Sequence, residues 1–172
     1  EEVTTIGDQA FSGCSNLPFI AIPESVTNIG IGAFSECRSL ASITIPSRVK
    51  SIANNTFDGC TSLTTINIPE SVTNIGKWAF YNCSSLTAFK IPESVSKIEY
   101  RAFSGCYNLT DITIPEGVTG IESYAFSSCI KLTSIDIPKS VTSIGSEAFY
   151  ACESLTTITI PENVTRIGSK AF

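Results

Sequence analysis

The sequence predicts a solenoid of mainly parallel β-strands with short 3₁₀ turns, in which about seven repeats of 23 residues stack in a gently curved rod. Two series of residues predict it, because phenylalanine and cysteine both recur at intervals of 23 positions. A fixed period of this length is typical of repeat proteins, whose neighbouring units bury a shared core. The phenylalanines are Phe11, Phe34, Phe57, Phe80, Phe103, Phe126, Phe149 and Phe172, and the cysteines are Cys14, Cys37, Cys60, Cys83, Cys106, Cys129 and Cys152.

The first element of each repeat is a predicted strand, as in residues 63–69. Ile66 and Ile68 alternate with polar residues there, which is the pattern of a strand with one buried face. Pro69 has no backbone N–H and cannot extend a hydrogen-bonded ladder, so we expect the strand to end at this residue. In one repeat Phe89 takes the place of the first inward isoleucine, and we expect it to pack in the core.

The second element is a return segment, in which Val72 and Ile75 are expected to point inward. Gly76 suits the bend that follows, but the bend does not require glycine. Other repeats hold Ala53, Glu99 and Glu122 at the same place.

The third element is a turn, because the core residues Phe80, Cys83 and Leu86 recur at every third position. This spacing fits a single 3₁₀-like turn better than a full helix. A solenoid without long helices on its outer side is expected to curve gently.

The repeated pattern L-x-x-I-x-I fits the leucine-rich-repeat core template, L-x-x-L-x-L, and 23 residues lie within its length range. The longer run I-G-x-x-A-F-x-x-C-x-x-L-x-x-I-x-I-P resembles the BspA-like class of these repeats over essentially the whole chain. The resemblance implies a secreted or cell-surface protein, of a family of bacteria and some protozoan parasites associated with attachment to host matrix proteins and other cells. The shared residues are core residues, so they specify the scaffold and not the ligand.

One domain is expected over residues 1–172, because no insertion or deletion interrupts the repeat. Solenoids usually cover their ends with polar capping repeats. Neither end of this sequence resembles such a cap, so we expect the domain to be a fragment of a longer array.

The composition disfavours two kinds of partner. The chain carries 16 acidic and 11 basic residues, a formal charge of −5, and no basic run longer than two residues. This charge argues against binding to nucleic acid. No run of about 18 apolar residues occurs, so direct membrane insertion is not expected.

Enzymatic chemistry is not expected, and neither is a cofactor or a bound metal. The chain has no histidine, which removes the usual triads and the commonest metal ligand. The cysteines are expected to be buried free thiols, with disulfides between column neighbours or metal binding as the alternatives. Asp111 and Asp136 could pair as carboxylates, but their surroundings offer nothing apolar that would shift a pKa.

A candidate partner-binding patch consists of Trp78, Tyr81, Tyr100, Arg101 and Tyr124. Trp78, Arg101 and Tyr124 occupy the same place in three successive repeats, just before the Ala-Phe pair. Tryptophan, arginine and tyrosine dominate the binding energy of protein interfaces, and they also form cation–π contacts. The alternative is that these side chains only brace one another along the stack.

The leading functional hypothesis is a non-enzymatic protein-binding or adhesion module of a secreted or cell-surface protein. Its partner is expected to be a protein, with host extracellular-matrix proteins as candidates. The alternatives are a structural spacer without a ligand of its own and a carbohydrate-binding surface.

Overall fold

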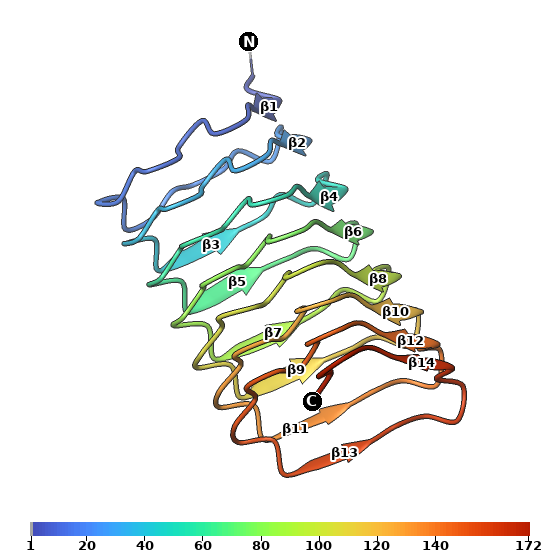
Figure 1. Cartoon of the computed structure of the whole chain (residues 1–172). Helices are drawn as coiled ribbons and strands as arrows, with labels where there is room; N and C mark the ends of the chain where they lie inside the picture. Colours follow the sequence, from blue (N-terminus) through green and yellow to red (C-terminus); the bar gives the residue numbers. More distant parts are fainter. Residues whose placement is uncertain (1) are drawn as a thin grey trace.

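The computed structural model describes residues 2–172, which wind into a solenoid with two short strands in most coils (Figure 1). The coils stack along one axis, and the two kinds of strand form two separate columns on the sides of the rod (Figure 1). In the part of the chain that the structure describes, no helix is long and apolar enough to cross a membrane.

The first column contains the strands predicted from the alternating isoleucines. Neighbouring strands pair in parallel as β3 with β5, β7 with β9 and β11 with β13, and each residue faces its equivalent in the next repeat. The outward side chains of these strands are exposed, and most of the central apolar ones are buried. The strands are β3 (Ser42–Thr44), β5 (Thr65–Asn67), β7 (Ala88–Lys90), β9 (Asp111–Thr113), β11 (Ser134–Asp136) and β13 (Thr157–Thr159).

The second column lies in the return segments, where the sequence predicted inward side chains but no strand. Six of its strands form one continuous parallel sheet in the order β14-β12-β10-β8-β6-β4, and β1 pairs separately with β2. Strands of two residues are too short to show an alternating pattern, so only the stacked register reveals them. They are β1 (Thr5–Ile6), β2 (Asn28–Ile29), β4 (Ser51–Ile52), β6 (Asn74–Ile75), β8 (Lys97–Ile98), β10 (Gly120–Ile121), β12 (Ser143–Ile144) and β14 (Arg166–Ile167).

The predicted 3₁₀-like turns are present as isolated turns. The Cys60 N–H donates to the Phe57 carbonyl at 3.1 Å, and the Leu63 N–H donates to the Cys60 carbonyl at 3.1 Å. Bonds that span three residues are those of a 3₁₀ turn. These bonds do not continue into a helix within residues 2–172. The predicted fold class, a solenoid of mainly parallel strands with short turns, is confirmed.

The turn segments also carry a third ladder between coils. The backbone N–H groups of Trp78, Phe80 and Asn82 donate to carbonyls of the next coil at 2.9–3.1 Å, while those of Ala79 and Tyr81 between them bond within their own turn. This alternation uses left-handed backbone at two positions of each coil, such as Trp78 (φ 53°) and Asn82 (φ 55°). Each coil is therefore joined to its neighbours along the turns as well as along the strands.

Stacked phenylalanines form the centre of the core. The eight phenylalanines that recur every 23 residues, from Phe11 to Phe172, stack ring on ring. Successive ring centroids are 5.3–5.6 Å apart, and successive ring planes lie within 11° of parallel. These separations lie in the range of attractive offset stacking. Phe89 lies edge-on between Phe80 and Phe103, with centroids at 4.9 and 4.8 Å, and is only 6% exposed. The larger side chain is therefore accommodated by packing, as expected.

Gly76 has a different role from the one that its bend suggested. Its φ is not positive, but a Cβ there would lie 2.8 Å from the Asn54 backbone nitrogen and 2.9 Å from the Ala53 carbonyl carbon. Glycine at this position permits a close approach to the preceding coil. Glu99 and Glu122 hold the same place elsewhere, so not every coil requires this approach.

The phenylalanine column predicts a graded response to truncation. Phe103 is completely buried, and we expect Phe103→Ala to lower the free energy of unfolding by about 3–5 kcal/mol, measured by chemical denaturation. Phe172 belongs to the same column but is 48% exposed, so Phe172→Ala should cost much less. Equal losses in the two variants would contradict the stacked core.

Candidate functional site

Four side chains of the predicted patch meet along the turn edge, and we call them the aromatic–arginine cluster: Trp78, Tyr100, Arg101 and Tyr124. The Trp78 and Tyr100 rings have centroids 5.0 Å apart at an interplanar angle of 79°, and the Tyr100 and Tyr124 rings lie 5.8 Å apart at 73°. Edge-to-face geometry of this kind is attractive. The cluster therefore runs across three successive repeats as one set of touching side chains.

Three residues of the cluster belong to the backbone hydrogen-bond ladder that joins the turns of successive coils. Trp78, Arg101 and Tyr124 all have left-handed backbone, with φ of 53°, 56° and 60°. Their N–H groups donate to carbonyls of the following coil: Trp78 to Tyr100 at 3.1 Å, Arg101 to Ser123 at 3.2 Å and Tyr124 to Ser146 at 3.0 Å. These bonds fix the Cα positions from which the side chains project.

Arg101 contacts two tyrosine rings. Its Cζ is 4.5 Å from the Tyr124 ring centroid and 5.4 Å from that of Tyr100, within the range of cation–π attraction. The Arg101 Nε atom is buried and has no hydrogen-bond partner among residues 2–172. No carboxylate pairs with the guanidinium in this described part of the chain.

Glu147 extends the cluster by one coil and was not included in the predicted patch. The Tyr124 hydroxyl donates a hydrogen bond to Glu147 Oε1 at 2.9 Å. This bond raises the pKa of the Tyr124 phenol, because ionisation would lose the hydrogen bond beside a carboxylate. The signal was available in the sequence, since Glu147 follows Trp78, Arg101 and Tyr124 in the same column.

Tyr81 was predicted to belong to the patch, but no ring contact joins it to the cluster within residues 2–172. Its backbone N–H bonds to the Trp78 carbonyl at 3.2 Å, so it lies in the same turn. The four cluster side chains and Tyr81 are all half-buried. Mutual bracing therefore accounts for part of their surface, and the rest is available to solvent or a partner.

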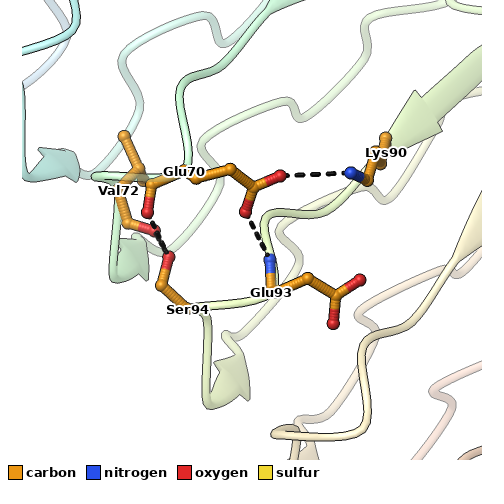
Figure 2. Close-up of polar contacts among 5 residues, drawn as sticks. All are labelled: Glu70, Val72, Lys90, Glu93 and Ser94. Carbon is orange, nitrogen blue, oxygen red and sulfur yellow. Dashed lines mark hydrogen bonds and ion pairs between the residues drawn. The ribbon is translucent and has the colours of Figure 1, made fainter.

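A second polar arrangement joins β7 to the turn after β5. Glu70 Oε1 lies 3.1 Å from Lys90 Nζ, and Glu70 Oε2 accepts the Glu93 backbone N–H at 2.9 Å (Figure 2). The Ser94 hydroxyl donates to the Glu70 carbonyl at 2.9 Å and also to the Val72 carbonyl. The Glu93 amide and then Lys90 lower the pKa of the Glu70 carboxyl. The Glu70 carboxylate, the Glu93 amide and the Ser94 hydroxyl are all bonded within the chain, so the arrangement joins coils.

Six cysteines are buried free thiols, as expected. Each buried S–H donates to a phenylalanine carbonyl 26 residues earlier, for example Cys106 to Phe80 at 3.3 Å and Cys83 to Phe57 at 3.2 Å. The expectation that the cysteines are buried is wrong for Cys14, which is exposed because no other coil of residues 2–172 covers it on that side.

Burial dominates the ionisation of the cysteine column. It raises the pKa of the Cys106 thiol to about 12 and that of Cys152 to about 11, because a thiolate loses its solvation there. The neutral thiol is a poor nucleophile and a poor metal ligand. Within residues 2–172, no group of three or more His, Cys, Asp or Glu is placed to hold a metal ion. Asp111 and Asp136 are exposed on the outer face of β9 and β11.

Comparison with known protein families identifies the repeat. A family model described as "BspA type Leucine rich repeat region (6 copies)" matches residues 1–100 and 73–172. The chain belongs to the BspA-type leucine-rich-repeat family. The resemblance inferred from the repeat is thereby confirmed. A comparison with curated proteins finds no match.

Solved structures of bacterial leucine-rich-repeat proteins are similar to this BspA-type chain. A leucine-rich repeat protein from Bacteroides ovatus is 34% identical over 97% of the chain and 49% of its own length, with a TM-score of 0.77. A leucine rich cell surface protein from Faecalibacterium prausnitzii is 32% identical over 97% of the chain and 51% of its own, with a TM-score of 0.70. A T. pallidum leucine-rich-repeat protein is 32% identical over 90% of the chain and 72% of its own, with a TM-score of 0.83. The chain spans about half the length of the first two proteins.

The thiol column predicts a loss of stability in alkali. The pKa of a buried thiol is raised above its value in the unfolded chain, so its stabilising contribution is complete below about pH 8.5 and is lost as the pH rises through the folded pKa. We expect the free energy of unfolding to fall above pH 8.5 by up to about 1.4 kcal/mol per pH unit for each buried thiol. Chemical denaturation at a series of pH values measures this slope.

Two variants isolate the thiol contribution from that of tyrosine and lysine. Cys106→Ser should make the alkaline slope shallower by about one thiol, and Cys14→Ser, at an exposed cysteine, is the matched control. The same slope in both variants would show that the buried thiols do not cause the loss.

Proposed function

We propose that this chain is a non-enzymatic binding module of a secreted or cell-surface protein, and that it binds a protein partner through the aromatic–arginine cluster. The observation that carries the proposal is the cluster itself, which spans three repeats and leaves part of each side chain accessible. Tryptophan, tyrosine and arginine are the residues most enriched among binding hot spots. The outward positions of the strands are mostly small or charged, with Phe19 as an isolated exposed aromatic residue.

Family membership supports the location and the class of protein. The BspA-type repeat supplies a scaffold without catalytic groups of its own, and the chain contains no histidine. The similar Faecalibacterium protein is described as a cell surface protein. A surface location and a binding role are consistent with an extended rod that presents many side chains along one edge.

A structural spacer is the second candidate, and the half-burial of the cluster favours it. Side chains that contact one another in edge-to-face pairs stabilise the stack whether or not a partner is present. In that case the cluster would strengthen the rod between other parts of a longer protein. Loss of the cluster would then change stability and leave binding unaffected.

The test is a binding screen of the purified chain against immobilised extracellular-matrix and plasma proteins. A variant with Trp78→Ala, Arg101→Ala and Tyr124→Ala is run beside a matched variant with Tyr107→Ala and Tyr150→Ala. The two control tyrosines are 44% and 45% exposed and lie outside the cluster. Circular dichroism confirms that both variants are folded.

We expect saturable binding by the unchanged chain and the control variant, with a loss of at least about tenfold in affinity for the cluster variant. Equal binding by all three proteins would move the binding surface away from the cluster. Absence of binding by all three would favour the spacer, and retention on a polysaccharide column instead would favour a carbohydrate ligand.

A further inference from the structure

We infer that Arg101 gives this surface its specificity, by pairing with a carboxylate side chain in an acidic segment of the partner protein. The inference rests on the proposed function and adds the chemistry of the partner. Three observations on the described residues support it: the guanidinium is unpaired, it is held in place, and its surroundings disfavour a dense polyanion.

The guanidinium is unpaired, whereas the neighbouring cation Lys97 has carboxylate partners. Lys97, four residues earlier in the chain, lies 2.9 Å from Glu122 and 3.8 Å from Glu99. Arg101 makes no such pair within residues 2–172, and its Nε is buried without a hydrogen bond. The two terminal Nη groups are not buried and make no hydrogen bond within residues 2–172, so they are the donors that a ligand carboxylate can reach.

The guanidinium is also held in place before any partner arrives. The rings of Tyr100 and Tyr124 both contact it, with centroids at 5.4 and 4.5 Å from its Cζ. Tyr124 is fixed in turn by its hydrogen bond to Glu147. A planar guanidinium can bind a carboxylate through two parallel hydrogen bonds, and side chains already ordered lose less entropy on binding.

The surrounding charge favours a protein carboxylate over a polyanion. Glu99, Glu122 and Glu147 lie in the same stack of turns as Arg101, and the whole chain carries a charge of −5. A sulfated polysaccharide would bring many like charges close to these carboxylates, which costs energy. A single carboxylate reaching Arg101 avoids most of this repulsion, and Trp78 and Tyr100 beside it offer apolar surface to the rest of the segment.

Trp78 provides a local reporter, because it is the only tryptophan of the chain and belongs to the cluster. The experiment follows its fluorescence while a short synthetic peptide, with one glutamate among glycine and leucine residues, is added. A matched peptide carries glutamine in place of glutamate and has the same shape without the charge. We expect a saturable change with the acidic peptide, weakened by salt, and none with its amide counterpart.

Three variants separate Arg101 from general electrostatics. Arg101→Gln should abolish the change, and Arg101→Lys should weaken binding about tenfold, because an ammonium cannot form the paired hydrogen bonds. Lys77→Gln removes an exposed positive charge next to Trp78 without touching the tyrosine rings, and it should have a much smaller effect. Circular dichroism again verifies that each variant is folded.

Several outcomes would overturn the inference. They are an equal fluorescence change with both peptides, no change with either, and a change with the glutamate peptide that persists in Arg101→Gln. A fluorescence change with heparin in place of the peptide would also overturn it. The proposed function can fail separately, if no matrix or plasma protein binds while the peptide response still depends on Arg101. Conversely, the cluster variant could lose binding to a protein partner while Arg101→Gln leaves the peptide response unchanged. That result would refute this inference and leave the proposed function intact.

Discussion

The stacking of each coil on equivalent residues of the next is the constraint on which the rest of this structure depends. A single coil exposes both of its flat sides, so its phenylalanine and cysteine are buried only when neighbours cover them. The interior coils bury both residues completely, whereas Cys14 and Phe172 at the two ends of the described chain stay exposed. The same register places each buried S–H against a carbonyl and each phenylalanine ring against another.

The turns meet this constraint through an unusual backbone. Alternate N–H groups bond within the turn and to the next coil, which requires left-handed residues at two positions of each coil. Left-handed backbone costs roughly 1–2 kcal/mol at a residue other than glycine. The hydrogen bonds between coils offset this cost, and the left-handed positions are free of core packing. Trp78, Arg101 and Tyr124 occupy one of these positions, so the scaffold leaves their identity open to binding or to bracing.

The repeat period predicted the fold class, the core columns and the family, because 23-residue recurrence and inward spacing are properties of the sequence alone. The return strands, such as Asn74–Ile75, escaped prediction because two residues cannot display a period of two. The left-handed turns escaped because tryptophan and tyrosine carry no signal for positive φ. Column position did predict that Trp78, Arg101 and Tyr124 share an edge. Column position could not show that the Tyr100 ring would contact Trp78 and Tyr124 while the Tyr81 ring would contact neither. Such ring contacts depend on the direction in which each side chain points.

The central claim, that register between coils holds the protein together, is tested most directly by deleting one interior coil. Removal of residues 104–126 joins Phe103 to Ser127 and restores every column, whereas removal of 104–125 shifts all later columns by one position. The measurement is the free energy of unfolding from denaturant titration. We predict that the in-register deletion folds cooperatively with a modest loss of stability, and that the shorter deletion loses far more. Equal losses from the two deletions would contradict the account.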